Sequence, residues 1–250
     1  IGARRASGGS IPVICSFIYY RELRTLMGAD PETVATVFEG LAVDAIGINC
    51  GFGPDLANEV LMRQYGLTDI PLLVQPNAGI PVLTGGRTVY PLGPESFVKY
   101  FQELIPNGAN IVGGCCGTTP DHIRLLASLA KELKPVPVHS PGFSKLSGST
   151  QTIYIGESFP TPIVGERLNP TGRKELTAEL QRKRYHTIAA EARNQVEEGA
   201  SMIDINVGIG VPDTKECDLM ADAILAVQRE VSVPIVIDSS DAETIEHGLE

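Results

Sequence analysis

The sequence predicts an α/β protein whose strands form parallel sheets. Short apolar runs alternate along the chain with longer stretches of helical periodicity, which is the pattern of repeated strand–helix units. Polar residues follow nearly every apolar run, as they do in proteins whose active site lies at the carboxyl ends of parallel strands. With 250 residues, of which 43% are hydrophobic, the chain can form one large domain or two of ordinary size.

Seven short runs are expected to be strands, because each is apolar and is bounded by glycine, proline or polar residues. They are Val13–Phe17, Ala45–Asn49, Leu72–Gln75, Asn110–Gly113, Ile163–Gly165, Met202–Asn206 and Ile235–Asp238. Four of them precede residue 134 and three follow residue 160, so neither group supplies the eight strands of a closed (β/α)8 barrel.

The segments between these runs carry helix signals. Asp30-Pro31-Glu32 combines an N-cap, a proline at the first helical position and an acidic residue in the first turn. Thr119-Pro120-Asp121 predicts a second helix start in the same way. Apolar residues also recur at helical spacing within residues 97–105, 188–196 and 220–227.

The periodic pattern fails between Lys134 and about Pro160, where prolines and a Gly/Ser/Thr cluster replace it. We therefore expect residues 1–134 to form one unit, residues 135–160 a linker with a short strand at Thr152–Ile155, and residues 161–250 a second unit. The chain begins with Ile1 rather than Met, and its last residues resemble an interrupted helix. We expect it to be a fragment of a longer polypeptide.

Composition narrows the class of function. Thirty acidic residues against 20 basic ones give a formal charge of −10, which opposes a phosphate backbone and argues against nucleic acid as a partner. No apolar run approaches the roughly 20 residues that span a bilayer, and no signal-peptide core follows the first residues. We expect no membrane partner and a cytoplasmic location. Five cysteines, an odd number, argue against a disulfide framework.

Three of these cysteines, Cys50, Cys115 and Cys116, end strand-like runs and are flanked by glycines. Consecutive strand residues point to opposite faces, so Cys115 and Cys116 can share a metal only if the backbone leaves the extended form, and we expect Gly113, Gly114 and Gly117 to allow this. Three thiolates fit a zinc site with an open fourth position, although spacing alone leaves the metal undetermined. The other two cysteines, Cys15 and Cys217, are expected to be buried.

Four segments, in this order, resemble the homocysteine-binding and pterin-binding modules of the cobalamin-dependent methionine synthase family. They are Asn49–Pro54, Gln75–Gly79, Gly113–Pro120 and Gly165–Gly172. The resemblance implies two (β/α)8 TIM-type barrels in tandem, each only partly covered by this chain. Residues 1–134 would be the C-terminal half of a zinc- and homocysteine-binding barrel, and residues 161–250 the N-terminal part of a pterin-binding barrel.

The resemblance also implies site residues. In the homocysteine methyltransferase family the cysteines of Asn-Cys and Gly-Gly-Cys-Cys-Gly bind zinc, and here these are Cys50, Cys115 and Cys116. The loop from Arg24 to Gly28 resembles the loop that follows that family's fifth strand. In the second unit the pterin-binding candidates carried over are Asn169, Asp204, Asn206 and Asp238. Carboxylates and amides suit a pterin, whose edge offers both hydrogen-bond donors and acceptors.

Two smaller expectations concern charged residues. Glu166 and Arg167 are adjacent in the fourth segment, and a structural charge pair and a direct role in the site are equally open. The histidines are expected to lie at the surface, in helices or in the linker. They are His122, His139, His186 and His247.

The function implied by the resemblance is methyl transfer from 5-methyltetrahydrofolate to homocysteine through cobalamin, with a zinc-activated thiolate as the methyl acceptor. Cobalamin would be bound by a domain outside this chain, because no corrinoid-binding motif occurs in it. Two alternatives stay open. One is another zinc-dependent thiol or corrinoid methyltransferase, and the other is a non-catalytic zinc-binding module.

Overall fold

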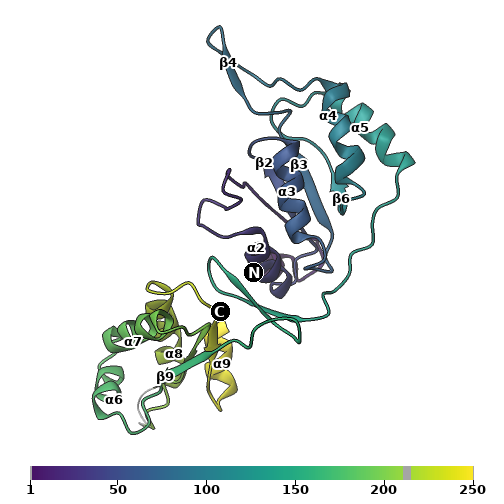
Figure 1. Ribbon diagram of the computed structural model, residues 1–250. Coiled ribbons are helices and arrows are strands. Elements are labelled where there is room, and N and C mark those ends of the chain that lie inside the picture. The colour runs from purple at the N-terminus through teal and green to yellow at the C-terminus, as the bar shows by residue number, and fades with distance from the viewer. Residues whose placement is uncertain (1, 211–214, 250) are drawn as a thin grey trace. The chain divides into compact units, whose positions relative to one another are not determined.

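Two parallel sheets organise the chain, one in each of the units into which it divides, Ile1–Gly142 and Phe143–Glu250 (Figure 1). The computed structural model describes residues 2–210 and 215–249. Each unit has an apolar core of its own.

The sheet of the first unit has four parallel strands in the order β1-β2-β3-β6. They are β1 (Ile14–Phe17), β2 (Ala45–Cys50), β3 (Leu72–Pro76) and β6 (Ala109–Val112). The four strands predicted for this part of the chain are confirmed, with bounds that differ by a residue or so. Because each strand pairs with the next one along the sheet, their carboxyl ends and the loops that follow lie along one edge.

Helices connect these strands. They are α2 (Pro31–Gly40), α3 (Pro54–Gln64), α4 (Pro94–Leu104) and α5 (Pro120–Glu132), and a short α1 (Gly2–Ser7) precedes the first strand. Successive helices pack beside one another, α2 with α3, α3 with α4 and α4 with α5, and α3 lies against β2 and β3 (Figure 1). Phe97 and Phe101 of α4 are fully buried in the core.

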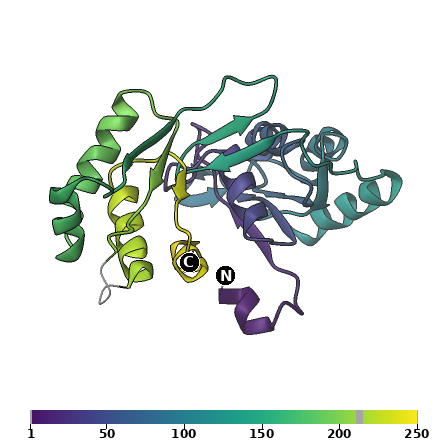
Figure 2. The same ribbon diagram turned by 90° about the horizontal axis from the view of Figure 1, so that it is seen from below.

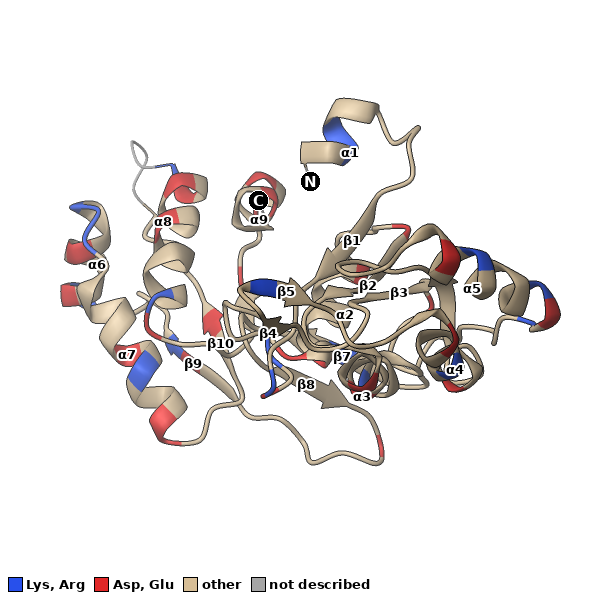
Figure 3. Ribbon diagram, turned by 90° about the horizontal axis from the view of Figure 1, so that it is seen from above, with Lys and Arg blue, Asp and Glu red and all other residues tan. Residues whose placement is uncertain are grey.

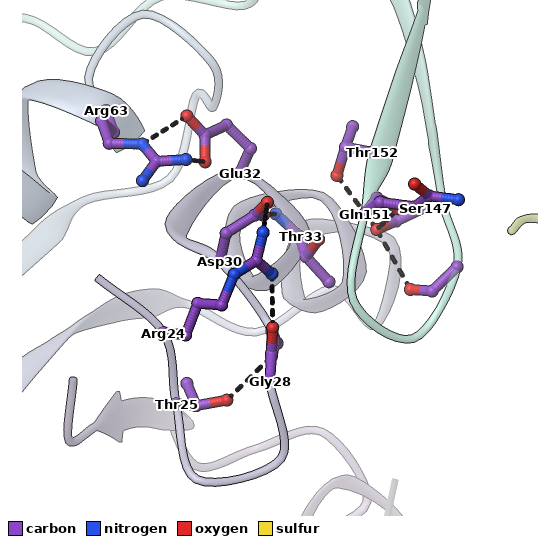
Figure 4. Close-up of polar contacts among 12 residues, drawn as sticks. Arg24, Thr25, Gly28, Asp30, Glu32, Thr33, Arg63, Ser147, Gln151 and Thr152 are labelled. Carbon is purple, nitrogen blue, oxygen red and sulfur yellow. Dashed lines mark hydrogen bonds and ion pairs between the residues drawn. The ribbon is translucent and has the colours of Figure 1, made fainter. Parts of the chain in front are cut away.

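The loop after β1 is held at its base by Arg24 and Asp30 (Figure 4). The Arg24 guanidinium donates to the carbonyl oxygen of Gly28 at 2.5 Å and lies 3.6 Å from the Asp30 carboxylate. Asp30 also caps α2, because its Oδ1 accepts from the backbone N–H of Thr33 at 2.8 Å. The predicted helix start at Asp30 is confirmed, and the same carboxylate fixes both the loop and the helix.

One histidine expected at the surface is buried. His122 is 4% exposed, because its ring completes the N-terminal cap of α5. Its Nδ1 accepts from the backbone N–H of Thr119 at 3.1 Å, which leaves the ring hydrogen on Nε2, 2.9 Å from the carbonyl oxygen of Leu92. The surface placement predicted for His122 is therefore wrong, since capping and core packing both use this side chain.

A hairpin that the sequence analysis did not predict follows β3. It consists of β4 (Val82–Thr84) and β5 (Arg87–Val89), which pair antiparallel and project away from the sheet (Figure 1). Gly85 and Gly86 form its tip with φ values of +56° and +76°, as two-residue hairpin turns require. All six strand residues are exposed. Because no strand residue is buried, the hairpin lacks the alternation of apolar and polar residues that predicts a strand. The Gly85-Gly86 pair was the feature of the sequence that could have predicted the turn.

The second unit contains a three-stranded parallel sheet in the order β11-β10-β9. Its strands, β9 (Val164–Leu168), β10 (Met202–Ile205) and β11 (Ile235–Ile237), confirm the three predicted. The helices are α6 (Lys174–Gln181), α7 (His186–Glu197), α8 (Glu216–Gln228) and α9 (Ala242–Leu249). Within this unit α7 packs beside α8, and α8 beside α9 (Figure 2).

The segment expected to be a linker contains ordered structure. A hairpin of β7 (Ser144–Ser147) and β8 (Thr152–Ile155) lies there, and β8 matches the short strand predicted at those residues. The rings of Phe143, Tyr154 and Phe159 pack against one another, with centroids 4.9 to 5.3 Å apart and Phe143 edge-on to the other two. This aromatic cluster explains why a segment rich in proline and glycine is folded.

Charged residues lie on the helices, as on α5, α6 and α7, and in the loops, whereas β2 and β3 carry none (Figure 3). Arg63 of α3 and Glu32 of α2 form a bidentate pair with N···O distances of 2.7 and 2.6 Å (Figure 4). Among the described residues no helix has the length and apolarity needed to cross a membrane.

We predict that Gly47→Ala destabilises the first unit by about 1–3 kcal/mol, because overpacking of a filled site costs that much. Gly47 pairs with Leu73 across β2 and β3, and a Cβ at Gly47 would overlap the Leu73 backbone. Urea denaturation measures the change. Gly40→Ala is the matched control, since nothing lies within 4 Å of its Cβ position. Equal unfolding midpoints for the two variants would show that the sheet has room at this point.

Candidate metal centre and second polar site

The three cysteines predicted as zinc ligands converge in the structure. The Sγ atoms of Cys50 and Cys116 are 3.9 Å apart, those of Cys115 and Cys116 are 3.8 Å apart, and all three lie within 4.8 Å of one another. Cys50 ends β2, and the other two follow β6, on the far side of β3. The common edge of the parallel strands brings these distant segments together.

Local backbone geometry turns the thiols toward one point. Cys50 has φ +60°, in the left-handed region, and so ends its strand with a sharp bend. Gly117 also has a positive φ, +81°, and a Cβ there would overlap the ring of Tyr90. Gly113 and Gly114 have another role than the one predicted: their Cβ atoms would crowd the side chains of Gln75 and Thr118. These two glycines supply space rather than an unusual conformation.

Asn77, in the loop after β3, ties the two cysteine-bearing loops together. It is 3% exposed. Its Nδ2 donates to the carbonyl oxygen of Gly51 at 2.7 Å, and its Oδ1 accepts from the backbone N–H of Cys116 at 3.2 Å. The backbone of the same loop pairs with the cysteine loop on the other side, from Cys115 N to Pro76 O at 2.9 Å and from Ala78 N to Cys116 O at 2.9 Å. Asn77 was not among the predicted site residues, although the segment that carries it was singled out.

The adjacent thiols of Cys115 and Cys116 differ in acidity. Hydrogen bonds from the Cys115 and Cys50 thiols and from the Tyr90 hydroxyl lower the pKa of Cys116, which is also the most exposed of the three. Burial raises the pKa of Cys115, and the hydrogen bond to Cys116 raises it further. Of this pair, Cys116 is therefore the first to ionise, with its neighbours acting as donors.

The geometry of these thiols fits a zinc ion. Zinc–sulfur bonds of about 2.3 Å in a tetrahedral array imply sulfur–sulfur separations of about 3.8 Å. Two of the three sulfur–sulfur separations are 3.8 and 3.9 Å, and the third is within 4.8 Å. Three protein ligands leave the fourth tetrahedral position for a further ligand, as in catalytic zinc sites.

The second unit gathers polar side chains at the ends of its strands. Asn206 Nδ2 donates to Asp238 Oδ2 at 2.9 Å, and Asn169 Nδ2 donates to Glu166 Oε1 at 3.0 Å. Burial raises the pKa of Asp204, and the negative charges of Asp238 and Glu166 raise it further. Glu166 thus belongs to the cluster with the four predicted residues, which consists of two amide–carboxylate pairs with Asp204 near both carboxylates.

Arg167 does not pair with Glu166. Its Nε lies 3.4 Å from Glu191, whose other oxygen binds Arg173 at 2.8 Å. Consecutive strand residues point to opposite faces, so Glu166 joins the polar cluster while Arg167 turns toward α7. The structural charge pair considered for Glu166 and Arg167 is wrong. Outside both sites, Cys217 is buried as predicted, whereas Cys15 is half-buried against the core.

Comparison with known proteins identifies the class. Residues 2–130 match the family model of homocysteine S-methyltransferases, and residues 165–250 match that of pterin-binding enzymes. The chain belongs to the homocysteine S-methyltransferase family.

Its curated relatives include two methionine synthases. The protein from Mycobacterium tuberculosis (strain ATCC 25618 / H37Rv) is 31% identical over 256 residues, and that from Mycobacterium leprae (strain TN) is 30% identical over 260 residues. Each alignment covers 100% of this chain and 21% of the relative, so the chain spans about a fifth of their length.

A solved structure, the homocysteine methyltransferase MmuM from Escherichia coli in its oxidised form, is 26% identical to this chain. It matches with a TM-score of 0.41 over 51% of this chain and 39% of its own.

We predict that Asp204→Asn raises the stability of the chain at neutral pH. The raised pKa means that the folded state binds the Asp204 proton more tightly than the unfolded state does, so ionisation at neutral pH destabilises the fold. The gain from Asn should be complete above the raised pKa and vanish as the pH falls to the ordinary carboxyl range. Urea midpoints across pH 3 to 8 test this. The exposed Asp218→Asn is the control, and a loss of stability in Asp204→Asn would contradict the prediction.

Proposed function

We propose that this chain supplies two substrate sites for methyl transfer from 5-methyltetrahydrofolate to homocysteine, with cobalamin as the methyl carrier between them. The observation that supports this most is the convergence of Cys50, Cys115 and Cys116 at the carboxyl edge of a parallel sheet. On this proposal residues 1–134 form the zinc and homocysteine unit and residues 161–250 the folate unit, as incomplete TIM-type barrels in tandem. Residues 135–160 connect them.

In the first unit Cys50, Cys115 and Cys116 would hold the zinc ion. Bound zinc supplies Lewis acidity that keeps the thiol of homocysteine ionised at neutral pH. Three protein thiolates outweigh the charge of the ion, which keeps a bound sulfur rich in electrons and reactive toward a methyl group. Asn77 would hold the two cysteine loops at a fixed separation, and the exposure of Cys116 leaves the site open to its substrates.

In the second unit Asn169, Asp204, Asn206 and Asp238 would bind the pterin ring of the folate. The Asp204 and Asp238 carboxylates can accept hydrogen bonds from the ring N–H and amino groups, and the amides can donate to its carbonyl oxygen. Pairing of Asn206 with Asp238 and of Asn169 with Glu166 fixes the orientation of both amides. Glu166 would act by positioning Asn169.

The proposal implies further partners. Cobalamin would be held by a separate domain or protein, because this chain carries no corrinoid-binding motif. That domain would present its cofactor to each unit in turn, since the methyl donor and the methyl acceptor bind at different sites. All five cysteines are free thiols, which fits a reducing compartment such as the cytoplasm.

Two other functions remain to be separated from this one by experiment. Another zinc-dependent thiol or corrinoid methyltransferase would share the open fourth zinc position, whereas a structural zinc site would be closed. X-ray absorption of the zinc-loaded chain with and without homocysteine separates an open zinc site from a structural one, and the folate-dependent assay of Asp238→Asn below separates the proposed function from another zinc-dependent methyltransferase. A new sulfur neighbour on adding homocysteine supports the proposal, and an unchanged spectrum favours the structural site.

We predict that Cys115→Ser loses about one equivalent of zinc relative to the unaltered chain, because the site needs all three thiolates. Metal analysis after dialysis against a mild chelator measures the loss. Cys15→Ser is the control, since that half-buried thiol lies outside the cluster. Undiminished zinc in Cys115→Ser, or equal loss in Cys15→Ser, would refute the ligand assignment.

The two substrate sites should be separable by mutation. In a polypeptide that carries both units and a cobalamin-binding domain, Asp238→Asn should slow folate-dependent methylation of homocysteine about tenfold or more, since hydrogen bonds to charged groups have that strength. Methylation of homocysteine by supplied methylcobalamin should stay nearly unchanged. Asp218→Asn serves as the control for both assays. Equal damage to both half-reactions in Asp238→Asn would indicate one composite site instead.

A further inference from the structure

We propose a second metal site in the second unit, formed by Cys217, Glu243 and His247, which would take zinc or a similar divalent cation. One ligand atom from each of these residues lies within 4.8 Å of the other two. The site shares no residue with the three-thiol cluster, and the proposal does not depend on the function assigned to that cluster.

Two adjacent helices bring the three side chains together. Cys217 is the second residue of α8, and Glu243 and His247 lie one turn apart on the same face of α9. The helices pack closely, because a Cβ added to Gly248 would lie 3.2 Å from Cδ1 of Ile224 on α8 and 2.8 Å from Cδ1 of Ile237. The three ligands therefore face a single, well-packed seam between neighbouring strand–helix units.

Cys217 is 6% exposed, whereas Glu243 and His247 are exposed. A buried thiol surrounded by apolar groups is ordinary core packing. This one differs because a carboxylate and an imidazole lie at its solvent side. Within the described residues the Glu243 carboxylate has no hydrogen-bond or ion-pair partner. It is not needed as a cap either, because Asp241 accepts from Thr244 N and Oγ1 at 2.9 and 2.7 Å.

The His247 ring is oriented by its own helix. Its Nδ1 lies 2.9 Å from the carbonyl oxygen of Glu243. Because a carbonyl oxygen only accepts, Nδ1 carries the ring hydrogen, and the neutral imidazole keeps its lone pair on Nε2. A histidine whose second nitrogen donates to a backbone carbonyl is the usual arrangement around a protein-bound metal.

The donor set suits zinc chemically. Zinc accepts thiolate sulfur, imidazole nitrogen and carboxylate oxygen. One thiolate and one carboxylate balance the two positive charges of the ion, so the loaded site would be neutral beside the apolar core. On binding, the sulfur–hydrogen bond of Cys217 breaks, a sulfur–metal bond forms, and the proton leaves to solvent. The bound ion would cross-link the start of α8 to two successive turns of α9.

The test uses cobalt(II), whose bond to a thiolate gives a charge-transfer band in the near ultraviolet. The 250-residue chain with Cys50→Ser, Cys115→Ser and Cys116→Ser together lacks the first cluster. We expect this variant to bind about one cobalt with a thiolate band and to release about one proton. Adding Cys217→Ser should abolish the band, and Glu243→Gln or His247→Ala should weaken binding about tenfold or more. Glu246→Gln on the same helix and Cys15→Ser are the matched controls.

The proposal is overturned if the triple variant is folded by circular dichroism but gives no band, or if the band survives Cys217→Ser. It is also overturned if neither Glu243→Gln nor His247→Ala weakens binding. Should the triple variant fail to fold, zinc stoichiometry decides the question in the otherwise unaltered chain. About two equivalents, falling to about one in Cys217→Ser, support the second site. Equal stoichiometry in the two proteins refutes it.

Discussion

The first unit depends on one buried side chain, the amide of Asn77. A parallel sheet brings the carboxyl ends of β2, β3 and β6 to one edge, but it does not fix the loops beyond them. Asn77 does so by donating to the Gly51 carbonyl oxygen and accepting from the Cys116 N–H. An amide is suited to this position because it offers a donor and an acceptor on one rigid group. Backbone hydrogen bonds already hold the Cys115–Cys116 loop to Pro76 and Ala78, and the Asn77 amide adds the link to Gly51 beside Cys50.

The two sites handle negative charge differently. In the first unit hydrogen bonds from neighbouring donors lower the pKa of Cys116, whereas burial raises the pKa of Cys115, so Cys116 ionises more readily than Cys115. In the second unit burial raises the pKa of Asp204, and the nearby carboxylates of Asp238 and Glu166 raise it further. Such crowding opposes folding, and carboxylates with raised pKa values are typical of functional sites.

The sequence predicted the sheets well because an apolar run between breakers describes a buried strand directly. It also predicted the meeting of Cys50 with Cys115 and Cys116, since parallel strands end at a common edge. What it missed depends on tertiary context. The burial of His122 follows from a cap that reaches Leu92, and the partner of Arg167 is Glu191 on a later helix. Neither contact changes the local pattern of apolar and polar residues, so that pattern could not predict it.

The β4–β5 hairpin has a consequence for engineering the protein. The hairpin lies between Ala78 and Tyr90, and Val82 pairs directly with Val89 at its base. The spacing of its two ends is therefore set by one cross-strand pair rather than by the length of the loop. A peptide tag or a fluorophore inserted between Gly85 and Gly86 would extend into solvent from a point connected to the Cys116 loop through Tyr90. The hairpin tip is thus a natural attachment point for a reporter of events at the thiols.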